Sequence, residues 1–223
     1  MNYKAFTLAE ILITLGIIGI IAALTLPVLI ANHRKNIVEL RLKRVYSILG
    51  NAMAFAVKDN GASKEWATAS SSEFIKTYLE PYLPGSSFVS ESKLAKMFVY
   101  TKEGSEIKLN AGYSSALKLK TGELIRVANG FNPAGNPPRV QISFIIQENK
   151  SNLYFIGKDY FTFYYNIDKD AIVWQDMLSY GYTCESSKDL LIERCGSYGA
   201  ESACMAMIIC NGWKIPDYYP IKL

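Results

Sequence analysis

The chain has 223 residues, of which 50% are hydrophobic, 20% are charged and 13% are aromatic. This composition excludes an intrinsically disordered chain and allows a hydrophobic core in one or two domains. The formal net charge of +4 lies within residues 1–60, since residues 61–223 carry 17 basic and 17 acidic side chains. A neutral remainder argues against nucleic-acid binding by bulk charge, and the single histidine, His33, argues against a histidine-based triad or metal site.

Residues 11–31 contain no charged side chain and, as a helix, would span about 31 Å, the thickness of a bilayer core. A cleaved secretory signal and an ordinary single-pass anchor are two possible interpretations. The run is longer than the apolar region of about 7–15 residues in a secretory signal, and it lacks a good cleavage site. Neither interpretation explains Glu10, whose carboxylate adjoins the apolar run and is costly there unless paired. We therefore expect a specific partner for Glu10.

Residues 4–27 resemble the processing and methylation motif of type IV prepilins and type II secretion pseudopilins. The resemblance lies in the sequence Lys4-Ala5-Phe6-Thr7-Leu8-Ala9-Glu10, the charge-free stretch that follows it, and Pro27. It implies cleavage between Ala5 and Phe6 by prepilin peptidase, N-methylation of Phe6 and a helix kink at Pro27. Family members usually carry glycine where this chain has Ala5.

The resemblance also implies an assembly role for Glu10, the fifth residue after the cut. Cleavage gives Phe6 a free amine, which the carboxylate of a neighbouring subunit can pair with in a filament. In a medium of low dielectric constant this attraction is strong, and an unpaired carboxylate is penalised. The pair would favour one axial register. The alternative is that Glu10 merely lies among lipid head groups.

Residues 33–58 continue helically, with an apolar stripe at three- and four-residue spacing. The stripe comprises Ile37, Leu40, Val45, Ile48, Ala52 and Phe55. Glu39 and Lys43 are spaced as a favourable i,i+4 ion pair, and Asp59-Asn60-Gly61 predicts the end of the helix. We predict a leader at residues 1–5, a transmembrane and filament-core helix at 6–32, an amphipathic helix at 33–60 and a globular head at 61–223.

Basic side chains follow the apolar run. They are His33, Arg34, Lys35, Arg41, Lys43 and Arg44. We interpret them as a solvated collar that faces lipid head groups, with a DNA-binding patch as the alternative. The positive-inside rule would place this basic side in the cytoplasm, whereas the resemblance places the head outside.

The head region shows one short helix followed by strand patterns. Ser70 and Glu73 form a capping box, and the helix is expected to end before Pro81. Strands are predicted at 98–101, 116–119, 124–127, 140–147, 161–167 and 171–175, with a hairpin at Thr121-Gly122 and a loop at 131–138. Short connections favour an antiparallel sheet packed on the long helix, hence an α+β fold.

Residues 140–167 loosely resemble the strand, turn and Gly-Lys-Asp-x-Phe pattern of pilin-like heads, with matches at 157–159 and Phe161. Some relatives place an aspartate turn before this pattern, where this chain has Ser143 and Glu148, so no calcium site is expected. Aspartates at 168, 170 and 176 lack a ligand-spaced loop. We expect no metal site, no cofactor and no catalytic residue.

Four cysteines, Cys184, Cys195, Cys204 and Cys210, lie in the last forty residues, which favours two disulfides in an exported head over a zinc site. Residues 201–211 look helical, which would separate Cys204 from Cys210 on different faces. The tail resembles relatives in its Gly-Trp-Lys-Ile-Pro and Asp-Tyr-Tyr-Pro sequences at 212–220. That resemblance implies a Cys195–Cys204 pair and leaves Cys184–Cys210.

The sequence carries no phosphate-binding loop, no hydrolase nucleophile motif and no zinc-protease histidine pair. We expect a structural subunit of a type IV pilus or type II secretion pseudopilus rather than an enzyme. Its expected partners are prepilin peptidase, other pilin or pseudopilin subunits, an inner-membrane assembly platform and membrane lipid, and nucleic acid is not among them. The expected location is the bacterial inner membrane and then a filament. The alternatives are a membrane-anchored binding module, such as an adhesin or DNA-uptake receptor, and an anchored hydrolase.

Overall fold

A computed structural model describes residues 7–109, 114–128, 131, 134, 139–173 and 182–223 of the chain. The chain divides into two compact units, one that runs to Ile37 and one from Val38 to Lys222. The long helix α1 (Leu8–Asn60) contributes to both units, and each unit is described by itself. The predicted helix of about fifty residues is confirmed at 53 residues, and Gly61, with φ +80°, follows its last residue.

The second half of α1 uses a different apolar stripe from the one its spacing suggested. Its buried positions are Val38, Glu39, Leu42, Val45, Leu49, Ala52, Met53 and Ala56. Of the predicted stripe, Val45 and Ala52 are buried, but Leu40 is 68% exposed and Phe55 is 54% exposed. The helix has apolar side chains on more than one face, so the period alone does not select the face that packs on the sheet.

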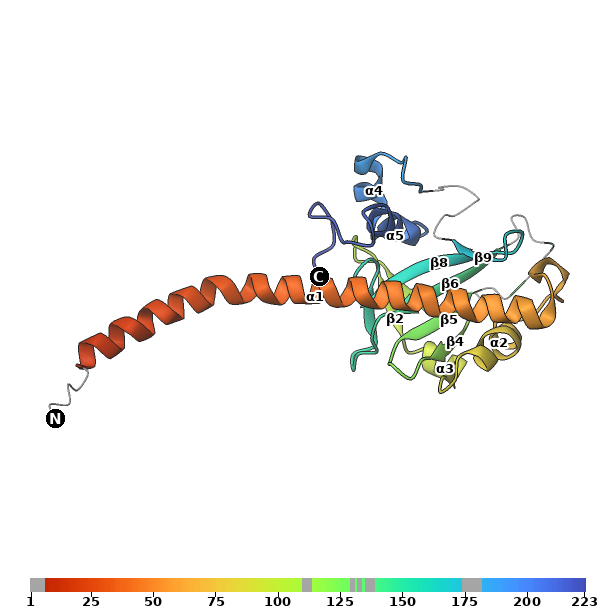
Figure 1. Ribbon diagram of the computed structural model, residues 1–223, viewed down its shortest axis with the longest axis horizontal. Helices are drawn as coiled ribbons and strands as arrows, with labels where there is room; N and C mark the ends of the chain where they lie inside the picture. Colours follow the sequence, from red (N-terminus) through yellow and green to blue (C-terminus); the bar gives the residue numbers. More distant parts are fainter. Residues whose placement is uncertain (1–6, 110–113, 129–130, 132–133, 135–138, 174–181) are drawn as a thin grey trace. The chain divides into compact units, whose positions relative to one another are not determined.

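The head contains a six-stranded antiparallel sheet in the order β1-β4-β5-β6-β8-β9. Its strands are β1 (Ser87–Val89), β4 (Ser115–Lys118), β5 (Leu124–Ala128), β6 (Arg139–Ile145), β8 (Tyr160–Asn166) and β9 (Ala171–Val173). The predicted hairpin is confirmed, because β4 and β5 pair with Lys118 opposite Leu124. The second half of α1 lies along this sheet (Figure 1).

The two faces of the large sheet differ in chemistry. The face toward α1 is aromatic and aliphatic, and Phe163 on β8 contacts both Tyr46 of α1 and Phe144 of β6, with ring centroids 5.3 and 5.2 Å apart. The opposite face follows the alternate positions of the same strands. It carries Arg126, Arg139, Gln141, Ser143, Tyr160, Thr162 and Tyr164. One face therefore forms the main core, while the other buries polar groups.

A second, three-stranded sheet has the order β3-β2-β7. Its strands are β2 (Phe98–Tyr100), β3 (Glu106–Lys108) and β7 (Leu153–Phe155). β2 pairs antiparallel with β3 and parallel with β7. Of these three strands, the sequence pattern predicts only β2, and the parallel pair departs from the expected antiparallel sheet. β3 and β7 have three residues each, too few for an alternating pattern to stand out.

Short helical segments complete the head. They are η1 (Ser63–Glu65), α2 (Ser71–Phe74), the π-helical η2 (Ile75–Leu79), η3 (Glu80–Tyr82), α3 (Glu91–Leu94), α4 (Lys188–Arg194) and α5 (Glu201–Cys210). The predicted capping box is present, because Ser70 and Glu73 cap each other at the start of α2. The helical turns continue through Pro81 rather than ending before it. The whole is the expected α+β fold with a disulfide-linked C-terminal region.

Candidate functional site

The first half of α1 exposes an apolar surface on all sides. Fourteen Leu, Ile and Val side chains of this half of the helix are each at least 47% exposed. They are Leu8, Ile11, Leu12, Ile13, Leu15, Ile17, Ile18, Ile20, Ile21, Leu24, Leu26, Val28, Leu29 and Ile30. This segment is long and apolar enough to cross a membrane. A helix that is hydrophobic all round requires lipid or other protein around it.

Thr7 and Glu10 form a capping box at the start of this helix, a feature that was not predicted from the sequence. The Thr7 backbone N–H and hydroxyl both donate to Glu10 Oε2, at 2.8 Å each. In return the Glu10 N–H donates to the Thr7 hydroxyl oxygen at 3.3 Å. The sequence Thr7-Leu8-Ala9-Glu10 matches the Ser/Thr-x-x-Glu signature, so the signal was present. Among the residues that the structure describes, the partner of the carboxylate is Thr7.

The other polar groups of the apolar segment are satisfied by its own backbone. The Thr14 hydroxyl donates to the carbonyl oxygens of Glu10 and Ile11, and the Thr25 hydroxyl donates to that of Ile21, all at 2.9 Å. Such internal bonds let threonine lie in a lipid environment. Pro27 lies inside the continuous helix, and the kink expected there stays a prediction. The predicted cleavage and methylation residues, Ala5 and Phe6, lie outside the described residues.

Glu39 joins α1 to the C-terminal tail of the head. Its side chain is buried, and it accepts hydrogen bonds from Lys214 Nζ at 2.6 Å and from the Ile215 N–H at 2.9 Å. The predicted pairing with Lys43 was therefore wrong about the partner. The true partners lie 175 and 176 residues away in sequence, beyond the reach of a local spacing rule.

The basic collar divides between solvent and the head. His33, Arg34 and Lys43 are exposed, as predicted. Arg41 instead donates to the Ile146 carbonyl oxygen at 2.8 Å, and Arg44 pairs with the buried Glu123 at 3.4 Å. The interpretation as one solvated collar was thus wrong for Arg41, which is half-buried against the head, whereas Arg44 stays exposed while it pairs with Glu123.

Two disulfides lie in the C-terminal region, Cys184–Cys210 and Cys195–Cys204. This is the pairing that the resemblance implies. The buried Cys195–Cys204 pair joins the turn after α4 to α5, and the Cys204 sulfur lies beside Gly157. The Tyr219 hydroxyl donates to the Gly157 carbonyl oxygen at 2.6 Å. The glycine of the Gly-Lys-Asp pattern, Gly157, therefore lies where the C-terminal tail packs against the head.

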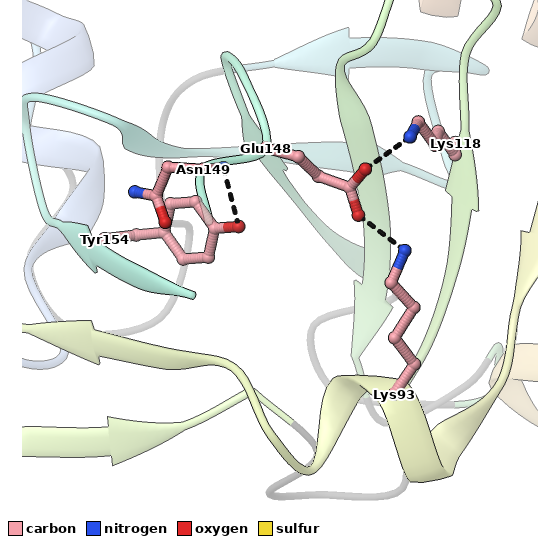
Figure 2. A network of polar contacts seen from close by, with 5 residues as sticks. All are labelled: Lys93, Lys118, Glu148, Asn149 and Tyr154. Atoms are coloured by element: carbon pink, nitrogen blue, oxygen red, sulfur yellow. Dashed lines mark hydrogen bonds and ion pairs between the residues drawn. The ribbon is translucent and has the colours of Figure 1, made fainter. Parts of the chain in front are cut away.

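Glu148 forms ion pairs with two lysines, at the place in the sequence where some pilin-like proteins have an aspartate-containing turn. Figure 2 shows its two carboxylate oxygens turned to Lys93 of α3 and Lys118 of β4, and the Lys93 contact measures 2.7 Å. The neighbouring Asn149 N–H donates to the Tyr154 hydroxyl oxygen at 3.4 Å. Burial alone would raise the pKa of the Glu148 carboxyl, but its bonds to Lys118 and Lys93 outweigh burial and lower it. The residue thus fastens three elements together.

Of the aspartates considered for a cation, Asp170 is engaged in hydrogen bonds within the head. Asp170 accepts hydrogen bonds from the Ser63 backbone N–H at 2.9 Å and from the Tyr165 hydroxyl at 3.1 Å, and it also bonds the Ser63 hydroxyl. Asp176 lies outside the described residues. Within the described ranges, no three His, Cys, Asp or Glu side chains gather as a metal site would require.

Two family models match the chain, and together they cover nearly all of it. Residues 1–26 match the prokaryotic N-terminal methylation motif, so the protein is of the class that carries a prepilin-type N-terminal cleavage and methylation segment. Residues 28–223 match the family described as "Family of unknown function (DUF6613)", and the chain belongs to that family. No curated protein and no solved structure matches the chain.

Proposed function

We propose that the mature chain is a structural, non-catalytic subunit of a type IV pilus or type II secretion pseudopilus. The observation that carries the proposal is the methylation motif at residues 1–26 on a helix whose apolar side chains are exposed all round. Prepilin peptidase would cut before Phe6 and release the apolar helix for packing with other pilin-like subunits, guided by the assembly platform. Before assembly, the same helix anchors the chain in the inner membrane.

Two features of the head support an extracytoplasmic location. Disulfides persist mainly in oxidising compartments, and all four cysteines of the head are paired in disulfides. This placement, with the head outside, is the one that the family resemblance implies, and it opposes the positive-inside rule for the basic residues after the apolar run.

The capping box permits a sharp test of the assembly role of Glu10. Glu10→Ala removes both the cap and the charge, and Glu10→Gln keeps a capping side chain but removes the charge. Thr7→Ala removes the hydroxyl bonds at 2.8 and 3.3 Å but keeps the carboxylate. Removing one side of a buried ion pair costs about 3–5 kcal/mol, so both Glu10 variants should lose at least about tenfold in filament incorporation. Thr7→Ala should assemble nearly normally.

The experiment co-expresses each variant with an assembly machinery and compares subunit in sheared filaments with subunit in the membrane. Thermal unfolding of the head should be unchanged in all three variants, because Thr7 and Glu10 lie outside the head unit. Peptidase processing should also be unchanged, because it depends mainly on the leader and on Ala5-Phe6. Normal incorporation of Glu10→Gln would contradict the charge-pairing role. Defects of equal size in Thr7→Ala and Glu10→Ala would show that helix capping, not the charge, is what assembly requires.

A further inference from the structure

The small sheet of the head has two edge strands, β7 and β3, and the chain's own bonds cover the β7 edge. Asn149 Nδ2 donates to the Leu153 carbonyl oxygen at 2.7 Å, and the Phe155 N–H donates to Asp159 Oδ2 at 3.3 Å. The Phe155 carbonyl oxygen accepts a bond from the Lys158 N–H at 3.1 Å. These bonds occupy backbone groups that a further strand would need, so the β7 edge is protected against pairing.

The β3 edge carries backbone groups that point away from the sheet. The Leu109 N–H donates to the Met97 carbonyl oxygen at 3.1 Å, which turns the backbone groups of Leu109 toward the side of β2. Antiparallel pairing alternates along a strand, so the groups of Ile107 also face β2, while those of Glu106 and Lys108 face outward. In the part of the chain that the structure describes, no strand and no other backbone group pairs with Glu106 or Lys108 on that side.

A second copy of β3 can use these outward groups in an antiparallel register centred on Ile107. Residues with outward groups must lie opposite one another, so Glu106 of each copy faces Lys108 of the other. Residues in such a pair exchange both of their backbone hydrogen bonds. Of the registers that this alternation allows, the centred one pairs every residue of the short strand.

The side chains select the same register. Glu106 and Lys108 are exposed, and the centred register places each carboxylate opposite an ammonium group of the other copy. A shift by two residues in either direction would place Glu106 opposite Glu106 or Lys108 opposite Lys108. Opposite charges across a strand pair stabilise it, and like charges destabilise it. The charges that usually keep an edge strand unpaired are therefore complementary here.

The charged groups are available for this contact. The Tyr100 hydroxyl donates to Glu106 Oε2, which fixes the carboxylate beside β2 and leaves its other oxygen for a partner. Among the described residues, Lys108 has no ion-pair partner. Ile107 is half-buried on the opposite face of the strand and would meet its own copy at the closely spaced, non-hydrogen-bonded position. Backbone, charge and apolar side chain thus agree on one pairing.

We propose that β3 is a docking edge for a second copy of this chain, and that antiparallel β3–β3 pairing joins the small sheets of two heads. The contact uses the same residues, Glu106 to Lys108, on both copies, so it closes on two chains and cannot by itself extend a filament. The inference goes beyond the proposed filament role, which does not use this edge. Short strands give a weak contact, which the high local concentration of heads held on a membrane would support.

The test is analytical ultracentrifugation of the full chain in detergent micelles over a series of protein concentrations. The parent should form a concentration-dependent dimer. Glu106→Lys places lysine opposite lysine and Lys108→Glu places glutamate opposite glutamate, so each should weaken dimerisation at least about fivefold. Lys150→Glu is the matched control, because it makes the same charge change as Lys108→Glu at an exposed turn, and it should dimerise like the parent.

The double variant Glu106→Lys/Lys108→Glu should regain the parent's dimerisation, and the two single variants should form heterodimers when mixed. Three outcomes would overturn the proposal: a parent that stays monomeric at every concentration, single variants that dimerise like the parent, or a double variant as weak as the single ones. The second outcome would place the association on another surface, such as the apolar half of α1. Because the readout is pairing of the unassembled chain, none of these outcomes bears on filament assembly.

Discussion

Gly157 lies where the turn before β8, the Cys195–Cys204 disulfide and the C-terminal tail meet. Its φ of +79° is a left-handed conformation that other residues rarely adopt. A Cβ atom built there would lie 2.6 Å from Cys204 Sγ and 3.0 Å from the Tyr219 hydroxyl oxygen. Neither neighbour can move freely, since one is in a disulfide and the other donates to the Gly157 carbonyl oxygen.

Gly157→Ala should therefore destabilise the head by more than the cost of its backbone conformation alone. Gly104→Ala is the matched control, because Gly104 has φ +86° but nothing within 4 Å of its Cβ position. The control should lose about 1 kcal/mol, and Gly157→Ala about 3 kcal/mol, in urea unfolding followed by circular dichroism. Equal losses would mean that the tail does not pack against Gly157.

Glu39 is the second residue whose role depends on distant partners. Glu39→Ala removes the acceptor of the buried Ile215 N–H and the ion-pair partner of Lys214. We expect this substitution to lower the free energy of unfolding by about 2 kcal/mol. Glu193→Ala, which removes an exposed carboxylate beside Arg194, should change stability by less than about 0.5 kcal/mol. A chemical-denaturation series on the two variants measures the difference, and a neutral Glu39→Ala would show that the tail does not depend on this contact.

Glu148 links the segment after β6 to α3 and β4. The pKa of its carboxyl is lowered from the ordinary 4.5 by the two lysine bonds, which outweigh burial. A lowered pKa in the folded state gives stability that is present above pH 4.5 and is lost as the pH falls through the folded value. Both lysines are partly exposed, so this contribution is about 1 kcal/mol or less.

Glu148→Gln should consequently lose less stability than the parent chain between pH 5 and pH 3. The other carboxyls of lowered pKa are common to both proteins, so the difference between the two pH profiles isolates Glu148. Thermal unfolding at half-unit pH steps provides the measurement. Parallel profiles would show that the two ion pairs in Figure 2 add no pH-dependent stability.

The elements that the sequence predicted well are those fixed by local chemistry. The capping box at Ser70, the β4–β5 hairpin and the end of α1 at Asn60 all depend on residues within a few positions of one another. The elements it missed depend on distant partners. β7 is a strand because it pairs in parallel with β2, more than fifty residues earlier, and no local pattern carries that information.

The same division applies to the candidate sites. The methylation motif is a contiguous sequence and was identified directly, whereas the pocket of about 360 Å³ in the head takes its lining residues Arg126, Arg139, Tyr198 and Glu201 from separate elements. An arginine in a strand pattern signals only that one face is polar. The face becomes a cavity when the second sheet covers it, which needs the parallel pairing that the sequence did not reveal.

For the molecule as a whole, the two disulfides should differ in accessibility. Cys195 and Cys204 are fully buried, whereas Cys184 and Cys210 are exposed. Mild reductant on the native chain should therefore open Cys184–Cys210 first, and alkylation followed by peptide mapping should label that pair alone. Removing this bridge by a Cys184→Ser/Cys210→Ser double substitution should cost about 2–4 kcal/mol. Simultaneous labelling of all four cysteines in the native protein would contradict the burial of the second pair.

Whether the chain is processed as a prepilin can be read from the intact mass of the protein. The protein is purified from the membranes of cells that contain a prepilin peptidase and is measured by mass spectrometry without reduction. Prepilin processing predicts a chain that begins at Phe6, carries one added methyl group and lacks the four hydrogens lost in two disulfides. A chain that begins at Met1, or one cut near Asn32, would contradict it.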